Sequence, residues 1–120
     1  MREGKNMTNR ESERRHSERF QTLNLLSYFE RDLSDAIVSQ GIAKTLDLSE
    51  NGALIEIPSK LTYVDSVTFE IALEEQIMTV KPEILDQTQT PQSTWKVRVR
   101  FPNLKPADYH RLAVFIHSLQ

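Results

Sequence analysis

Apolar and polar side chains alternate along most of this chain with the period of β-strands, and the pattern becomes helical only near the C-terminus. Residues 96–101 are the clearest case, because valine and phenylalanine alternate there with lysine and arginine, which predicts one buried and one charged face. Residues 20–29 are rich in leucine and aromatic side chains, and their composition allows either a strand or a helix. Further strands are predicted at residues 41–46, 53–57, 66–73 and 76–85, the last of them around Pro82.

The segments between and after these strands complete the predicted fold. The polar residues 30–40 are expected to form a hairpin connection, and residues 86–94 a turn. Near the C-terminus, Pro106 suits the first turn of a helix, and apolar residues follow at helical spacing at Leu112, Phe115, Ile116 and Leu119. The pattern predicts a mainly β fold: a small antiparallel barrel of about six strands whose open end or flank is covered by a C-terminal α-helix.

Composition narrows the class of protein. A chain of 120 residues with 38% hydrophobic residues can fill one core, and no apolar run approaches the roughly 18 residues that a membrane-spanning helix needs. The polar start has no hydrophobic region of an export signal, so we expect a cytoplasmic protein. Cysteine is absent, which excludes disulfides and cysteine metal sites. The net charge of −2 argues against a general DNA or RNA binder.

The N-terminal end differs in composition from the rest. Residues 1–19 hold six basic and four acidic side chains, with two methionines as their only apolar residues. Such a segment buries too little surface to offset its ordering entropy, so residues 1–13 are expected to be a flexible tail, and residues 14–120 to form the domain.

Two short segments carry the candidate chemistry. Residues 15–19 have the sequence RHSER, which places the guanidinium groups of Arg15 and Arg19 four residues apart. Guanidinium groups match phosphate oxygens, or the O6 and N7 edge of guanine, in a bidentate way. Residues 47–52 have the sequence DLSENG, in which the Asp47 carboxylate can accept hydrogen bonds from the N1 and N2 donors of guanine. Ser49 adds a hydroxyl, and Gly52 allows a turn or a close approach to a ligand.

These two segments resemble the PilZ domain, a family of bacterial receptors for cyclic di-GMP. The signature of that family is R-x-x-x-R, followed after one strand and a connection by D/N-x-S-x-x-G, and both halves are complete here. The order of the segments and the C-terminal helix also agree with the family. The resemblance favours a strand within residues 20–29 and covers almost the whole chain after the first dozen residues.

The resemblance implies a ligand and a set of binding residues. It implies that cyclic di-GMP is bound by Arg15, Arg19, Asp47, Ser49 and Gly52, with Arg14 as a possible addition that influences whether one ligand or an intercalated pair binds. It also implies an arm around the two arginines that closes over the ligand and signals to a protein partner. One departure is Arg98, which stands in the last strand where many family members have glycine, so strand packing is expected to differ there.

The same residues allow other interpretations. Arg15 and Arg19 are also compatible with surface ion pairs, and residues 47–49 with a turn whose side chains bond their own backbone. Lys96, Arg98 and Arg100 form a basic strand face that could contact phosphate, although such a face is most often solvated sheet surface. The three histidines lack partners at metal-site spacing, so we expect no metal site. No G-x-S-x-G segment surrounds Ser49, and we expect no catalytic residue and no cofactor. The alternatives to a receptor are a PilZ-like protein adaptor with weak or no ligand binding and a small hydrolase, for which no complete catalytic group is found.

Overall fold

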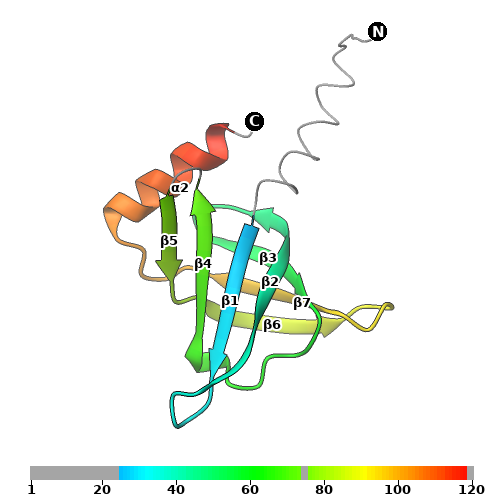
Figure 1. Ribbon diagram of the computed structural model, residues 1–120. Helices are drawn as coiled ribbons and strands as arrows, with labels where there is room; N and C mark the ends of the chain where they lie inside the picture. The colour runs from blue at the N-terminus through cyan, green and yellow to red at the C-terminus, as the bar shows by residue number, and fades with distance from the viewer. Residues whose placement is uncertain (1–24, 74–75, 119–120) are drawn as a thin grey trace, which may run out of the picture.

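The computed structural model describes residues 25–73 and 76–118, and these form one seven-stranded sheet with a helix at its end (Figure 1). The strands follow the order β5-β4-β1-β2-β3-β7-β6, and all neighbours are antiparallel. The elements are β1 (Leu25–Arg31), β2 (Ile37–Leu48), β3 (Gly52–Ile57), the 3₁₀ helix η1 (Val64–Ser66), β4 (Val67–Leu73), β5 (Gln76–Val80), β6 (Glu83–Gln89), β7 (Trp95–Arg100) and the α-helix α2 (Pro106–Ser118).

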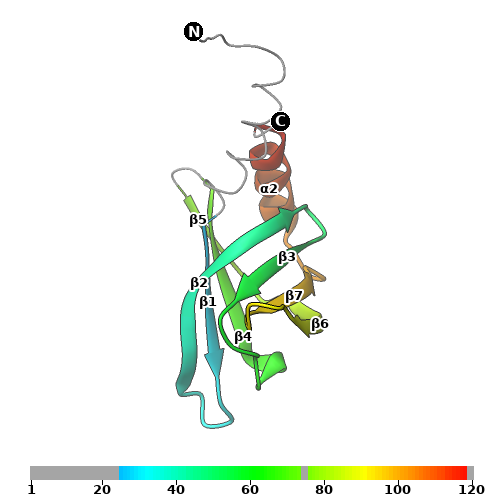
Figure 2. The same ribbon diagram turned by 90° about the vertical axis from the view of Figure 1, so that its right-hand side faces the viewer.

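The sheet curls around a single core. Strands β1, β4 and β5 stand at a steep angle to β6 and β7, because the sheet twists strongly between them (Figures 1 and 2). Alternate side chains point inward, as in β4, where every second residue from Val67 to Leu73 is buried. The helix α2 adds Leu112, Phe115 and Ile116 to the same core. The predicted mainly β fold with a C-terminal helix is therefore confirmed.

The sheet remains open between its two edge strands. β5 pairs only with β4, and β6 only with β7, within the described residues. Lys81 and Pro82 connect β5 to β6, and a proline has no N–H to donate to a ladder, so the chain changes direction here instead of continuing as one strand. The predicted barrel is thus an incompletely closed one, with seven strands in place of about six.

Side-chain hydrogen bonds join the segment before η1 to β6 and to β1. The Gln87 side chain accepts from the backbone N–H of Leu61 at 2.8 Å and donates to the Leu61 carbonyl at 3.1 Å, as a paired strand would. The carboxylate of Glu30, which is buried on β1, accepts from the backbone N–H groups of Thr62 and Tyr63. Both contacts join residues far apart in sequence, and they fix the start of η1.

Three element boundaries differ from the sequence prediction. The predicted strand over residues 76–85 is two strands, β5 and β6. The turn predicted at residues 86–94 begins only at Thr90, because residues 86–89 extend β6 along β7. The hairpin connection predicted at residues 30–40 is a turn of residues 32–36, and β2 runs from Ile37 to Leu48. In the second and third of these places, residues on an edge strand or beside the hairpin turn pair as strands, because backbone pairing there does not require a buried face.

Candidate functional site: a depression over β3

The segment of residues 47–52 forms the tight connection between β2 and β3. Backbone hydrogen bonds join Ser49 and Gly52 in both directions, at 2.9 and 3.4 Å, around a loop of two residues. The Ser49 hydroxyl accepts from the N–H of Asn51 at 3.2 Å and donates to the carbonyl of Gly52 at 3.3 Å. The Asn51 carbonyl accepts from the N–H of Phe101 at 2.8 Å, which ties the turn to the end of β7. Ser49 therefore has a role in the turn itself.

Gly52 is required by the packing of β3 against β7. A Cβ atom at this position would lie 2.2 Å from the carbonyl oxygen of Val99 and 3.1 Å from the Cα atom of Arg100. Both obstacles are backbone atoms, so no side-chain rotation would relieve the overlap. The backbone torsion φ of Gly52 is not positive, so the turn alone does not demand glycine. The close approach that the sequence suggested is made here to a neighbouring strand.

Two residues of the segment 47–52, Asp47 and Gly52, lie in register with arginines of β7. Asp47 lies opposite Leu54, and Leu54 lies opposite Arg98, so these three residues form a row across three strands. Gly52 lies opposite Arg100 in the next row. Neighbouring strands are about 4.8 Å apart, which places the backbones of Asp47 and Arg98 about 10 Å from each other.

These rows border a shallow hollow on the outer face of the sheet, which we call the β3 depression. Its volume is about 360 Å³. Leu54 is among the residues that line it. Sequence reasoning missed Leu54, Asn51 and Leu85, because neither an apolar residue in a strand nor an asparagine in a turn is distinctive. The lining residues are Asp47, Ser49, Asn51, Gly52, Ala53, Leu54, Leu85, Arg98, Val99 and Arg100.

The two arginines of the β3 depression are paired with carboxylates of β6. Nε of Arg98 lies 3.3 Å from Oδ2 of Asp86, and Nε of Arg100 donates to Oε1 of Glu83 at 2.9 Å. Arg98 fits the sheet in place of the glycine usual in the family, because its side chain is exposed on the outer face and leaves the β3–β7 ladder regular. The predicted arginines of the first motif, Arg14, Arg15 and Arg19, lie outside the described residues, as does the predicted tail.

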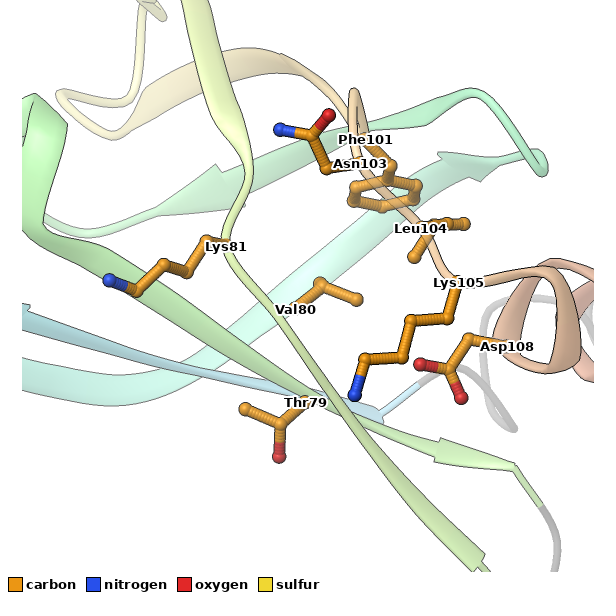
Figure 3. Close-up of a pocket in the computed structure, with 8 residues that line it drawn as sticks. All are labelled: Thr79, Val80, Lys81, Phe101, Asn103, Leu104, Lys105 and Asp108. Carbon is orange, nitrogen blue, oxygen red and sulfur yellow. The ribbon is translucent and has the colours of Figure 1, made fainter.

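Three other hollows of similar size among the described residues contain none of the residues 47–52. One of about 280 Å³ lies between the end of β5 and the start of α2 (Figure 3). Its wall is largely apolar, with Val80, Phe101 and Leu104, and Lys81 points away from it (Figure 3). Volume alone therefore does not select a site, whereas the convergence of Asp47 with two arginines does. Within the described residues, no group of three or more metal-binding side chains gathers.

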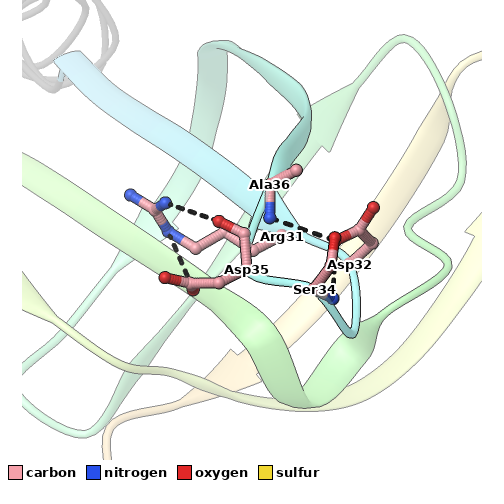
Figure 4. Close-up of polar contacts among 5 residues, drawn as sticks. All are labelled: Arg31, Asp32, Ser34, Asp35 and Ala36. Carbon is pink, nitrogen blue, oxygen red and sulfur yellow. Dashed lines mark hydrogen bonds and ion pairs between the residues drawn. The ribbon is translucent and has the colours of Figure 1, made fainter.

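The β1–β2 turn presents a second surface feature at the far end of β2 from Asp47. Its Asp32 carboxylate accepts from the Ser34 hydroxyl at 2.7 Å and from the N–H groups of Ser34 and Ala36 at 2.9 and 3.0 Å (Figure 4). The Ser34 hydroxyl, followed by the Ala36 N–H, lowers the pKa of Asp32 below its ordinary value of 3.8. The turn exposes Leu33, of which 94% is accessible, beside the half-exposed Ile37 and Val38.

Comparison with known families agrees with this arrangement. The family model described as PilZ domain matches residues 13–118. The chain belongs to the PilZ domain family. The PilZ match includes the segments of residues 15–19 and 47–52, and it ends at Ser118, the last residue of α2.

Two solved structures share the fold of this chain. The transcription regulator MrkH, described as dependent on c-di-GMP, has a TM-score of 0.58 and 11% identity, over 80% of this chain and 46% of MrkH. YcgR from Escherichia coli, in complex with c-di-GMP, has a TM-score of 0.55 and 15% identity, over 79% of this chain and 41% of YcgR. The chain thus spans less than half of either protein. A search of curated proteins found no significant match. No helix in the described part of the chain is long and apolar enough to cross a membrane.

Proposed function

We propose that this PilZ domain is a receptor for cyclic di-GMP that performs no chemistry on its ligand. The observation that carries the proposal is the β3 depression, where the Asp47 and Ser49 of the family signature face two guanidinium groups across a half-buried leucine. The family match and the c-di-GMP named for both MrkH and YcgR support the same ligand.

Each side chain of the site has a chemical role toward a guanine nucleotide. Asp47 accepts from guanine N1 and N2, which distinguishes guanine from adenine because adenine presents no such pair of donors. Ser49 keeps acceptor capacity on its oxygen beyond its bond to Asn51, and Gly52 leaves the depression open beside it. Arg15 and Arg19 bind phosphate and guanine from the opposite side, with Arg14 beside them as an additional cation.

Ligand binding changes the surface of the domain, because the binding groups lie in two separate parts of the chain. Asp47 lies in β2 and Ser49 in the turn that follows it, whereas the arginines precede β1, so the ligand bridges two parts of one domain over residues 14–120. Binding closes the arginine arm over the β3 depression, and the changed surface is what a downstream protein partner in the cytoplasm recognises. Residues 1–13 form a flexible tail in this scheme.

Calorimetric titration with cyclic di-GMP tests the proposal directly. Arg15→Ala, Arg19→Ala and Asp47→Ala each remove a charge-assisted hydrogen-bonding group and should weaken binding by roughly 10- to 100-fold. Asp47→Ala should also reduce the preference for cyclic di-GMP over cyclic di-AMP. Arg31→Ala and Asp65→Ala are the matched controls, because both residues lie outside the β3 depression. Binding by the arginine variants at wild-type affinity would refute the site.

A protein adaptor with weak or no ligand binding is the second candidate. The β1–β2 turn favours it, because Asp32 braces a loop that presents Leu33, Ile37 and Val38 to solvent. Such a cluster on a fixed turn suits insertion into an apolar pocket of a partner. A wild-type protein that shows no heat of binding with cyclic di-GMP at millimolar concentration would favour this candidate.

A further inference from the structure

The carboxylates of β6 extend the two rows that cross the β3 depression. Asp86 lies opposite Arg98, which continues the row from Asp47 through Leu54 to a fourth strand. Glu83 lies opposite Arg100 and continues the row that begins at Gly52. Neither carboxylate lines the β3 depression, so each holds its arginine from outside the hollow.

Both ion pairs are weak enough to exchange. The side chains of Arg98 and Asp86 are 63% and 54% exposed, and those of Arg100 and Glu83 are 58% and 47% exposed. Solvent screens charges that are exposed to this extent, so such pairs shift an equilibrium by about fivefold at most. A phosphate that enters the β3 depression can therefore displace either carboxylate at a small cost.

The fold does not depend on these pairs to hold β6. The backbone ladder to β7 runs from Glu83 to Gln89, and the Gln87 side chain anchors the other edge of β6 to Leu61. The charges of Asp86 and Glu83 are therefore not needed to keep β6 in the sheet. The residues that line the β3 depression carry two positive charges, on Arg98 and Arg100, and one negative charge, on Asp47. The carboxylates that pair with these arginines from β6 turn this net positive charge into a net negative one.

We propose that Asp86 and Glu83 act as internal competitors of the ligand's phosphates for Arg98 and Arg100. This inference rests on the proposed function of the β3 depression and names the residues that tune its affinity. In the free protein each carboxylate occupies a guanidinium group, and in the complex a phosphate oxygen replaces it. The carboxylates also disfavour monoanionic ligands, because one negative charge is insufficient to displace both pairs.

The test is a set of charge-neutral, nearly isosteric variants titrated with cyclic di-GMP by calorimetry. Asp86→Asn and Glu83→Gln should each tighten binding by about two- to fivefold, and the double variant by more. Asp35→Asn changes the net charge equally at the far β1–β2 turn, where its side chain is 87% exposed, and should leave affinity within about 1.5-fold of wild type. Equal affinity of wild type, Asp86→Asn and Glu83→Gln would overturn the proposal.

A second arm establishes that the effect passes through the arginines. In an Arg98→Gln background, Asp86→Asn should no longer tighten binding, because the guanidinium group that it releases is missing. Tightening of the same size in that background would also overturn the proposal, since it would indicate a long-range charge effect.

A third arm separates this inference from the proposed function. Inorganic pyrophosphate is titrated while the Nε–H signals of Arg98 and Arg100 are followed by NMR. The signals should move at lower pyrophosphate concentration in Asp86→Asn and Glu83→Gln than in wild type. If wild type does not bind cyclic di-GMP, the proposed function fails, and this titration alone decides the inference: signals that move identically in all three proteins refute it.

Discussion

Replacement of Gly52 by alanine separates folding from ligand binding at the signature segment. A Cβ atom at residue 52 would lie 2.2 Å from the Val99 carbonyl oxygen, whereas ordinary contact begins at 3.4 Å, so the two atoms must separate by 1.2 Å. Since the obstacle is backbone, β3 and β7 must move apart where Gly52 pairs with Arg100. Overpacking of this kind costs about 3 kcal/mol, the upper part of its usual range.

That cost is large for a domain of this size. A loss of about 3 kcal/mol lowers the melting temperature of a domain of roughly 100 residues by about 12–24 °C. The assay is urea and thermal unfolding followed by the fluorescence of Trp95, the single tryptophan, which lies at the start of β7 and reports on the affected strand. Affinity for cyclic di-GMP is then measured only below the unfolding transition, so that a folding defect is not mistaken for a lost ligand contact.

Gly41→Ala is the matched control on the neighbouring strand β2. Its Cβ atom would meet the ring and hydroxyl of Tyr28 at 3.3 Å, and a side chain can adjust where a backbone cannot. The lower chain entropy of alanine in the unfolded state offsets part of any cost, so Gly41→Ala should change stability by less than about 1 kcal/mol. Unfolding of Gly52→Ala at the same urea midpoint as Gly41→Ala would refute the argument from the β3–β7 approach.

Two further predictions concern the rest of the fold. Glu30→Ala leaves the N–H groups of Thr62 and Tyr63 without their acceptor and should lower the free energy of unfolding, measured by thermal unfolding, by about 2 kcal/mol or more. Glu30→Gln should lower it by less. An equally large loss of stability in Glu70→Ala, on the outer face of β4, would contradict the role of Glu30. The folded-state pKa of Asp32 lies below 3.8, so its hydrogen bonds should stabilise the turn above about pH 4 and be lost as the pH falls through that lowered pKa. An NMR titration of the Ser34 and Ala36 amides should therefore have its midpoint below pH 3.8. A midpoint at or above pH 3.8, or loss of the turn in Asp35→Asn at neutral pH, would count against this role of Asp32.

The strongly alternating and helical segments were predictable from sequence. In β4 and β7 every second side chain enters the core, so hydrophobicity alone reveals the strand, and in α2 the spacing of Leu112, Phe115 and Ile116 reveals the buried face. The edge strand β6 was not predictable over residues 86–89, because its side chains are largely solvated and only the ladder to β7 makes it a strand. The start of β2 was missed for the same reason.

The sequence by itself determined which residues carry the candidate chemistry, because R-x-x-x-R and D-x-S-x-x-G depend only on spacing along the chain. It did not determine that Arg98 and Arg100 share a depression with Asp47, nor that Asp86 and Glu83 hold them. Those neighbours are separated by at least 12 residues along the chain, and only the pairing of β2, β3, β7 and β6 in register brings them together. The requirement for Gly52 has the same origin, since a backbone oxygen of another strand occupies the space that a side chain would need.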